Sequence, residues 1–511
     1  MPHSSAYVDI DGDCIADLFL VCQGKSMDAP HYEVWTASGD DHKLASSGDF
    51  PSGTGMLSFA DLDRDGTIDI VYPSCVGNKC YVNVADNKQV PLCSTQPADW
   101  TLPWLTGNKS STSPVETSAK KQQPGAAHCR DPGNLCTADP GFQLETQSRT
   151  FSITDLLGEG WSLMLTDASV TPARPVPISV GDYNKDGYPD LLVVATNEKN
   201  GGRSEAVLLT NTRCSKAPRG APGCSAEEVE KKYGGDSDEA RTFVRAAGSE
   251  GLQAIENVVG ASFVDLDEDG SLDILLQTLT FDGNSASSWK PVHSTVFMRN
   301  YLFFDSFFLK LLMLNGACDG VCPPLKSIGE NESSSVTRSS FKPWGVNYAG
   351  ASYKFTVLDP NGVRRAQHVG QLAQTGYGAL LTPSTYLGLG RTNNYVELLE
   401  VGSSRRQGKE QRVLSMEGVI PNSQIYINPW QPPPPPAQDG SVAEMTTKAA
   451  TGTWSKEMYL HPGEWIIWVL VVLVAIVVVL CAIVVLLHVH ERREDEKERK
   501  RAVYAINFDA L

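Results

Sequence analysis

Four nine-residue segments rich in aspartate constrain the fold of this 511-residue chain. They read DIDGDCIAD at 9–17, DLDRDGTID at 61–69, DYNKDGYPD at 182–190 and DLDEDGSLD at 265–273. Each has a side-chain oxygen at positions one, three, five and nine, and each runs into an apolar stretch typical of a β-strand. Carboxylates this close together repel by roughly 1 kcal/mol or more per close pair unless a cation neutralises them. The pattern therefore predicts four cation-binding turns, each leading into a strand.

Calcium is the cation that this spacing favours, because it takes oxygen ligands at alternate loop positions with a glycine at the turn. The segments resemble the start of the helix-flanked calcium loop, but Tyr72 stands where that loop has its twelfth-position glutamate. We therefore expect structural Ca²⁺ at up to four sites rather than a calcium switch. The predicted ligands are the side chains of Asp9, Asp11, Asp13, Asp17, Asp61, Asp63, Asp65, Asp69, Asp182, Asn184, Asp186, Asp190, Asp265, Asp267, Asp269 and Asp273, with the backbone carbonyls of Ile15, Thr67, Tyr188 and Ser271.

The first loop departs most from the pattern, since Gly12 precedes its third aspartate and Cys14 follows it. The alternative interpretation of the four segments is a set of aspartate-rich turns that hold no metal. Recurrence of the pattern, always ahead of a strand, argues against that alternative.

The spacing of the loops suggests repeats of about 50–60 residues, a length typical of propeller blades. The loops begin at 9, 61, 182 and 265, so 52, 121 and 83 residues separate their starts. The longest interval has room for an extra blade without metal ligands around 151–167. Polar insertions are expected at about 106–140 and 215–240. The sequence therefore predicts an all-β fold with a β-propeller over 1–325, in which 301–314 forms a buried strand pair.

A different composition begins near residue 341, beyond which no aspartate loop occurs. Residues 341–428 are expected to form a small β-sandwich-like domain close to the membrane. One predicted hairpin turns at DPNG (359–362), and a second lies within YLGLGRTNNYVELLEV (386–401). The proline run that follows predicts a semi-rigid stalk over 429–464.

Residues 465–487 form an uncharged apolar run of 23 residues, long enough to cross a bilayer as one helix. Lysine and arginine crowd the carboxyl side of this run, so the positive-inside rule places the tail, 488–511, in the cytoplasm. The chain is thus predicted to be a type I protein of the plasma membrane or a secretory-pathway membrane. Asn108 and Asn331 are candidate glycosylation sites on the outer side. Because no signal peptide precedes the first loop, we expect the true amino terminus to lie further upstream.

Twelve cysteines also point to an oxidising compartment. Zinc binding is disfavoured because no Cys-x-x-Cys pair occurs. Eleven cysteines lie outside the apolar run, so one thiol is expected to be free or to lack its partner. The disulfide candidates, grouped by short spacing, are Cys75 and Cys80, Cys129 and Cys136, Cys214 and Cys224, and Cys318 and Cys322.

The net charge of −17 argues against nucleic-acid binding. Fifteen of the sixteen side-chain positions in the loops are carboxylates, so much of the negative charge belongs to the predicted metal sites. No phosphate-binding glycine loop, zinc-protease motif or serine-hydrolase motif is present, and the nine histidines are scattered. The sequence therefore does not predict an enzyme.

The loops resemble the FG-GAP repeats of integrin α-chain propellers. Longer segments carry a more specific resemblance: PWGVNYAGASYKFTVLDPNG, QLAQTGYGALLTPSTYLGLGRTNNYVE, VIPNSQIYINP and the terminal NFDAL look like the T-cell immunomodulatory protein family. The resemblance covers most of the chain. It implies a type I surface glycoprotein with an FG-GAP propeller, a β-domain near the membrane and a role in modulating T cells.

The favoured function is therefore a non-enzymatic surface protein whose calcium-stabilised propeller binds an extracellular protein or glycan. One alternative is an assembly or trafficking factor of the secretory pathway. Another, less favoured, is an ectohydrolase, since FG-GAP propellers also occur beside hydrolase domains.

Overall fold

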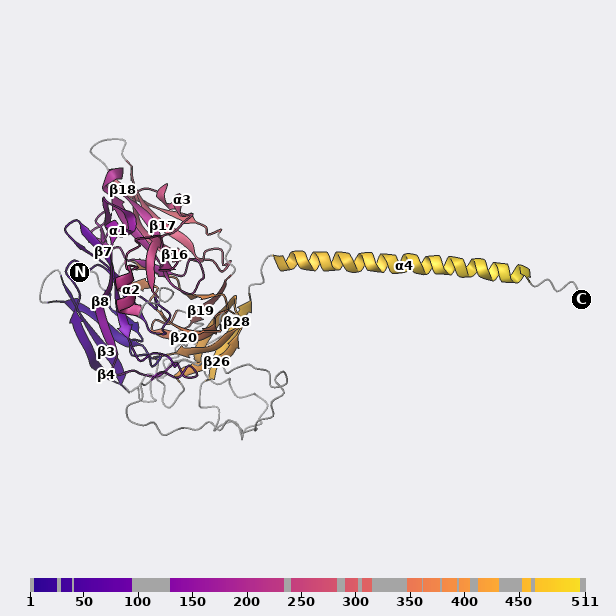
Figure 1. The fold of residues 1–511 in the computed structure, drawn as a ribbon, viewed down its shortest axis with the longest axis horizontal. Coiled ribbons are helices and arrows are strands. Elements are labelled where there is room, and N and C mark those ends of the chain that lie inside the picture. The colour runs from indigo at the N-terminus through magenta and orange to yellow at the C-terminus, as the bar shows by residue number, and fades with distance from the viewer. Residues whose placement is uncertain are drawn as a thin grey trace, which may run out of the picture. The chain divides into compact units, whose positions relative to one another are not determined.

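The computed structural model describes residues 4–24, 29–38, 41–93, 129–233, 240–282, 290–301, 306–314, 347–360, 362–376, 379–392, 395–404, 412–431, 453–460 and 465–505. The chain divides into two compact units, Met1–Tyr459 and Leu460–Leu511. The first unit is built mainly of β-strands, and the second contains one long helix (Figure 1). The predicted all-β character with one apolar helix near the carboxyl end is confirmed.

Four antiparallel sheets, here called repeat sheets one to four, follow one another along the chain. Sheet one contains β1 (Ala6–Val8), β2 (Asp17–Gln23), β3 (Pro30–Ser38) and β4 (Asp41–Asp49). Sheet two contains β5 (Ser58–Ala60), β6 (Asp69–Val76), β7 (Lys79–Lys88) and β8 (Gln143–Ser152). Sheet three contains β12 (Ser179–Gly181), β13 (Asp190–Asn197), β14 (Arg203–Arg213) and β15 (Arg241–Arg245), with β9 (Trp161–Leu163) beside β13. Sheet four contains β16 (Val258–Val264), β17 (Asp273–Asp282) and β18 (Lys290–Met298).

Each aspartate loop connects the first and second strands of its sheet. The ninth-position aspartate starts the second strand and pairs with the last residue before the loop: Val8 with Asp17, Ala60 with Asp69, Gly181 with Asp190, and Val264 with Asp273. The prediction that every loop runs into a strand is therefore confirmed. The four hairpins therefore share the same loop length and the same register.

Hydrophobic cores lie between consecutive repeat sheets. One core joins sheets one and two through residues such as Phe19 and Tyr72. The next joins sheets two and three, where Phe151 meets Phe243 with ring centroids 5.3 Å apart. A third joins sheets three and four through Leu208 and Leu276. Each sheet therefore buries its faces against its neighbours in the sequence.

Buried asparagines also link neighbouring repeat sheets. Asn87 of sheet two donates from Nδ2 to the carbonyl of Ile10 in the first loop, at 2.8 Å. Asn211 of sheet three donates to the carbonyl of Leu62 in the second loop, at 2.9 Å. Asn300, just after β18, donates to the carbonyl of Tyr183 in the third loop, at 3.3 Å. In each case the carbonyl belongs to position two, so every loop but the last is held by the next sheet.

Asn211→Ala is expected to lower the free energy of unfolding by about 2–4 kcal/mol, because it leaves buried polar groups unpartnered. These are the Leu62 carbonyl and Nε of Arg241, which donates to the Asn211 Oδ1 at 2.8 Å. Chemical denaturation of the full chain in non-ionic detergent measures the change. Asn134→Ala removes an exposed asparagine and should change stability by less than about 0.5 kcal/mol. Equal effects of the two variants would contradict the role given to Asn211.

The extra blade expected around 151–167 is not a separate sheet. Its residues instead form the end of β8, the short helix α1 (Ile153–Leu157), β9 and one strand of the pair β10 (Thr166–Asp167) and β11 (Arg174–Pro175). In the second insertion, the helix α2 (Ala226–Tyr233) precedes β15. The other short elements of this region are the turn η1 (Glu198–Asn200) and the helix α3 (Glu250–Gln253).

Two further four-stranded sheets form the carboxyl-terminal β-domain. One has the order β24 (Thr385–Gly390), β19 (Phe307–Met313), β27 (Ser423–Gln431) and β28 (Thr453–Leu460). The other has the order β21 (Arg364–Gln371), β20 (Ala351–Leu358), β25 (Val396–Gly402) and β26 (Val413–Val419). A single core that includes Leu311, Tyr353 and Leu399 fills the space between them. The small hairpin of β22 (Thr375–Gly376) and β23 (Ala379–Leu380) stands apart.

This β-domain differs from its predicted boundaries. β19 comes from the segment expected to be a strand pair of the propeller, and β28 comes from the expected stalk. Both pair with β27, so strands from outside 341–428 complete the sheet. The hairpin at DPNG is confirmed by the pairing of β20 with β21. The second expected hairpin is wrong, because β24 and β25 lie in different sheets and the chain crosses between them.

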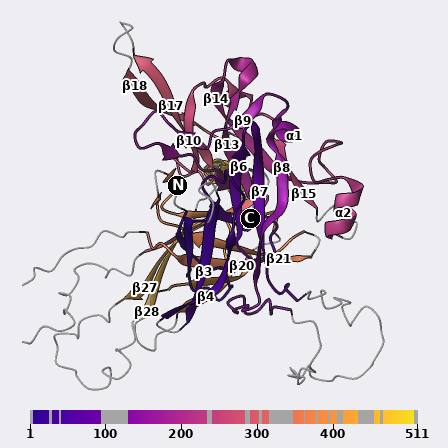
Figure 2. The ribbon, with the colours of Figure 1, turned by 90° about the vertical axis from the view of Figure 1, so that its left-hand side faces the viewer.

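The β-domain packs directly against the repeat sheets (Figure 2). Asp65 of the second loop forms a β-bridge with Ala366 of β21, and the Tyr386 hydroxyl of β24 donates to the Gly270 carbonyl at 2.9 Å. The aspartate loops therefore lie at the junction between the two sets of sheets.

The second unit contains α4 (Trp465–Ala505), the one helix of the described chain that is long and apolar enough to cross a membrane. It starts at the predicted boundary and continues past Leu487 through the charged segment. The expected tail thus begins as a continuation of the same helix.

Candidate metal loops

All four aspartate loops share one backbone conformation. Positions four and six have positive φ in each loop: Gly12 and Cys14, Arg64 and Gly66, Lys185 and Gly187, Glu268 and Gly270. The irregular first loop therefore differs from the others in residue type rather than in shape. Its glycine takes position four, and Cys14 takes the left-handed position six at φ 68°. That conformation is uncommon for a residue with a Cβ atom.

The same hydrogen bonds hold each turn. The carboxylate at position five accepts from the backbone N–H of position seven at 2.7–2.8 Å in all four loops. One oxygen at position nine accepts from the N–H of position two, at 2.8–3.3 Å. The other accepts from an N–H in or just after the third strand: Ala37, Asn87, Asn211 and Asn300. These bonds fix the direction of the carboxylates. Where an oxygen accepts a single hydrogen bond, it keeps a further lone pair for a cation.

Burial and mutual repulsion raise the pKa values of the loop carboxyls. Burial, followed by the charge of Asp9, raises the pKa of Asp11 to about 6 and that of Asp13 to about 7. Burial and the Asp65 charge raise the pKa of Asp63 to about 7. The pKa of Asp61, almost completely buried, is raised well above its usual value for the same reasons. Neighbouring basic side chains therefore offset the burial and repulsion of these groups only in part, which is the electrostatic situation that a bound cation relieves.

Three loops bring carboxylate oxygens into a cluster that fits a metal ion. Within the described residues, one oxygen from each member of a trio lies within 4.8 Å of the others: Asp9, Asp11 and Asp13; Asp61, Asp63 and Asp69; Asp265, Asp267 and Asp269. Buried Oδ1 atoms of Asp63 and Asp265 have no hydrogen-bond partner. Unpartnered buried carboxylate oxygens cost free energy unless a ligand satisfies them, so the donor set suits a hard cation such as calcium.

The third loop fits a metal less well. Its three aspartates do not form such a trio within the described residues. The Arg241 guanidinium lies 3.8 Å from the Asp186 carboxylate. Burial raises the pKa of Asp186, and the charge of Arg241 partly offsets that rise.

Basic side chains from the β-domain reach the first and last loops, and sequence reasoning missed them. Nζ of Lys354, on β20, lies 3.7 Å from the Asp9 carboxylate and donates to the Gly12 carbonyl at 2.5 Å. Nζ of Lys310, on β19, lies 3.2 Å from the Asp265 carboxylate. Both lysines are buried. The only signal in the sequence is one lysine within each apolar strand, FFLKLLM and ASYKFTVL.

A serine, a histidine and an aspartate also meet beside the first loop. The Ser352 hydroxyl lies 2.7 Å from Nε2 of His368, and the same nitrogen lies 3.3 Å from the Asp9 carboxylate. A catalytic triad requires serine and aspartate on opposite ring nitrogens, whereas both contact Nε2 here. All three residues are at most 1% exposed. Burial holds the pKa of His368 well below its usual value, so this group is a neutral structural contact.

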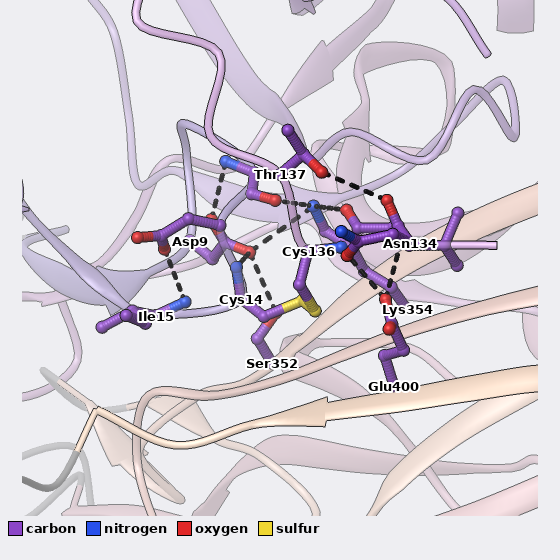
Figure 3. The surroundings of a disulfide bond; sticks show 12 residues. Asp9, Cys14, Ile15, Asn134, Cys136, Thr137, Ser352, Lys354 and Glu400 are labelled. Carbon is purple, nitrogen blue, oxygen red and sulfur yellow. Dashed lines mark hydrogen bonds and ion pairs between the residues drawn. A yellow bond between two sulfur atoms is a disulfide. The ribbon is translucent and has the colours of Figure 1, made fainter. Parts of the chain in front are cut away.

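The first loop is also joined by a disulfide to the end of the predicted insertion at 106–140. Cys14 bonds Cys136, and the carboxylate of Glu400 on β25 accepts from the N–H of Cys136 at 3.0 Å (Figure 3). Nearby, Nη2 of Arg130 donates to the Asp65 carbonyl of the second loop at 2.8 Å. The end of the insertion is therefore part of the junction between the loops and the β-domain.

The disulfides follow the short spacings only in part. Cys75 bonds Cys80, and Cys214 bonds Cys224. The grouping of Cys129 with Cys136 is wrong, because Cys129 bonds Cys93 and Cys136 bonds Cys14. Spacing fails here because the chain folds back between distant segments. Cys22 and Cys481 are the free cysteines of the described chain.

Several predicted sites lie outside the described residues: Asn108, Asn331, Cys318 and Cys322. The position-seven carbonyls of Ile15, Thr67, Tyr188 and Ser271 lie within the loops, and their role as ligands stays a prediction.

Two protein-family models match parts of the chain. The model described as "FG-GAP repeat" matches 178–209, which contains β12, the third loop and β13. The model described as "ITFG1, C2 domain" matches 343–459. This second match ends within β28 and supports the assignment of β28 to the carboxyl-terminal β-domain.

The chain also has similar relatives over its length. It is 27% identical over 514 residues to the T-cell immunomodulatory protein of Mus musculus, covering 100% of this chain and 67% of the relative. It is 28% identical over 508 residues to the T-cell immunomodulatory protein homolog of Plasmodium falciparum (isolate 3D7), covering 97% of this chain and 60% of the relative. The chain is 25% identical over 387 residues to protein linkin of Caenorhabditis elegans, covering 74% of this chain and 54% of the relative.

Proposed function

Because this chain belongs to the T-cell immunomodulatory protein family, we propose that it is a non-enzymatic, single-pass protein of the cell surface. Its FG-GAP sheets, as part of a β-propeller stabilised by calcium, display a surface that binds an extracellular protein or glycan. The observation that carries the proposal is the geometry of the loops. Three of them cluster carboxylates near the junction with the β-domain, and in two of these loops a buried carboxylate oxygen has no hydrogen-bond partner among the described residues.

The calcium in this proposal has a structural role. Carboxylates of the first, second and fourth loops would hold it, and its charge would offset their repulsion where the repeat sheets meet the β-domain. An extracellular setting supports this role, because calcium is abundant there and disulfides persist there. The four disulfides agree with such a compartment.

Modulation of T cells comes only from the name of the mammalian relatives. A relative from Plasmodium falciparum is named as a homolog of that protein, so we restrict the proposal to surface binding. The buried and neutral group around His368 supports a non-enzymatic role, since no substrate could reach it.

Antibodies against the β-rich unit and against the tail test the membrane arrangement in cells that express the full chain. We expect the first antibody to stain intact cells and the second to stain only after permeabilisation. Cross-linking on intact cells, followed by mass spectrometry, would then identify the partner. Staining of internal membranes alone, with none at the surface, would favour the trafficking alternative and contradict the proposal.

A further inference from the structure

A cavity of about 480 Å³ between repeat sheet three and the β-domain is strongly basic. We call it the basic pocket. Six of its lining side chains are cationic: Arg64, Arg213, Lys216, Arg241, Arg365 and Arg391. Only two lining residues, Asp186 and Asp359, are acidic. This excess of positive charge is unexpected in a chain whose net charge is −17, so it marks a local feature rather than a general property of the surface.

Arg64 is the central residue of the basic pocket. It stands at position four of the second loop and is only 7% exposed. Its Nη1 donates to the Asp186 carbonyl at 3.4 Å, whereas its buried Nε and Nη2 have no hydrogen-bond partner among the described residues. Buried donors of a charged group are costly when unsatisfied. Both atoms have almost no accessible surface, so an acceptor in the pocket would satisfy them after a small shift of the Arg64 side chain.

The position of Arg64 is fixed by its surroundings. A Cβ atom at Gly187 would come within 2.2 Å of Nη1, so glycine at this point makes room for the guanidinium. The Tyr188 ring lies between two arginines, with its centroid 5.3 Å from Cζ of Arg64 and 3.3 Å from Cζ of Arg241. These contacts hold two guanidinium groups in place before any ligand arrives.

Arg241 is anchored as well. Its Nε donates to the Asn211 Oδ1 at 2.8 Å, and its Nη2 donates to the Asn211 carbonyl at 2.7 Å. These bonds engage two of the five donors of Arg241, and a guanidinium held in place loses little conformational entropy when its remaining donors meet an oxyanion. The volume of the pocket lies in the usual range for small-molecule sites, about 300–1,000 Å³.

We propose that the basic pocket binds a sugar-sized molecule that carries a phosphate or sulfate ester, with the ester group on Arg64. This inference goes beyond the proposed surface function, because it requires neither bound calcium nor a particular membrane orientation.

Titration calorimetry on the full chain in non-ionic detergent, at low ionic strength with calcium present, tests the proposal. The probes are glucose 6-phosphate, glucose 6-sulfate and unmodified glucose. We expect at least one ester to bind and glucose to give no signal. If one ester binds more tightly than the other, that preference shows whether the natural ligand carries a phosphate or a sulfate. Failure of both esters to bind would overturn the proposal.

A matched pair of double variants shows where binding occurs. Arg213→Gln with Lys216→Gln removes two charges from the pocket, and Arg219→Gln with Lys231→Gln removes two exposed charges elsewhere. We expect the pocket variant to lose affinity about tenfold or more, and the control to stay within about twofold. If the double variant does not fold, the single variant Lys216→Gln, at an exposed position, replaces it in the comparison. Equal losses in pocket and control variants would show that general charge attraction causes the binding, and would overturn the site.

Discussion

Removal of calcium is expected to lower the melting temperature of the full chain by about 10 °C or more. A ligand present at about 100 times its dissociation constant stabilises the folded state by about 2.7 kcal/mol per site. Three loops offer clustered carboxylates, so their combined effect is about 8 kcal/mol. In a domain of this size, each kcal/mol corresponds to roughly 1–2 °C. Tryptophan fluorescence in excess EDTA and after calcium is restored measures the change.

Magnesium at the same concentration is the control, because it prefers a tighter, octahedral site and should restore little stability. An unchanged melting temperature in EDTA, with removal of the metal verified by elemental analysis, would contradict structural calcium. The proposed anion site would be unaffected by that result, since Arg64 and Arg241 do not require the metal.

The pH dependence of stability should have opposite signs with and without calcium. Folding raises the pKa values of Asp13 and Asp63 to about 7, from about 4 in an unfolded chain. A carboxyl with a raised pKa binds its proton more tightly in the folded state, so this contribution is lost as the pH rises through about 7. The chelated protein should therefore melt higher at about pH 6 than at about pH 8. The calcium-loaded protein should instead melt lower at about pH 6 than at about pH 8, because protons displace the metal.

Loss of the disulfide between Cys14 and Cys136 is expected to be the most destabilising of the cysteine changes. It closes a loop of 122 residues, for which the chain-entropy relation gives about 5 kcal/mol. The disulfide between Cys75 and Cys80 closes only 5 residues and gives about 2 kcal/mol by the same relation. Double serine variants of each pair, compared by chemical denaturation of the full chain, measure the difference.

The first disulfide also fixes Cys14 in its left-handed conformation at position six of the first loop. Its removal should therefore weaken calcium binding at this loop, while the Cys75 and Cys80 variant should keep the calcium affinity of the original chain. Equal losses of stability in the two variants would contradict the larger stabilisation expected from the longer closed loop.

The sequence made the loops predictable because their chemistry is local. Asp61, Asp63 and Asp69 lie within one turn, so spacing alone places their carboxylates together and starts a strand at the last of them. The long apolar helix was predictable for the same reason, since an uninterrupted apolar run needs no partner to be recognised. Even the irregular first loop keeps the shared backbone conformation, although its glycine stands at position four and Cys14 takes position six.

The contacts around the loops could not be predicted, because their partners are distant in the sequence. Lys354 reaches the Gly12 carbonyl across 342 residues, and no periodic pattern connects two such positions. The same reason explains the errors over Cys129 and Cys136 and over the strands β19 and β28. A strand of correct composition can complete any sheet, and only the path of the chain decides which one.

The sequence by itself thus determined four aspartate turns, the strands that follow them and one helix long and apolar enough to cross a membrane. The tertiary structure decided how these turns are used. It placed buried lysines, Arg130 and the Cys14–Cys136 disulfide around them, and it left Arg64 with unpartnered donors in a basic pocket. The physical reason is that backbone turns and apolar runs depend on neighbouring residues, whereas charge compensation depends on which distant segments the hydrophobic cores bring together.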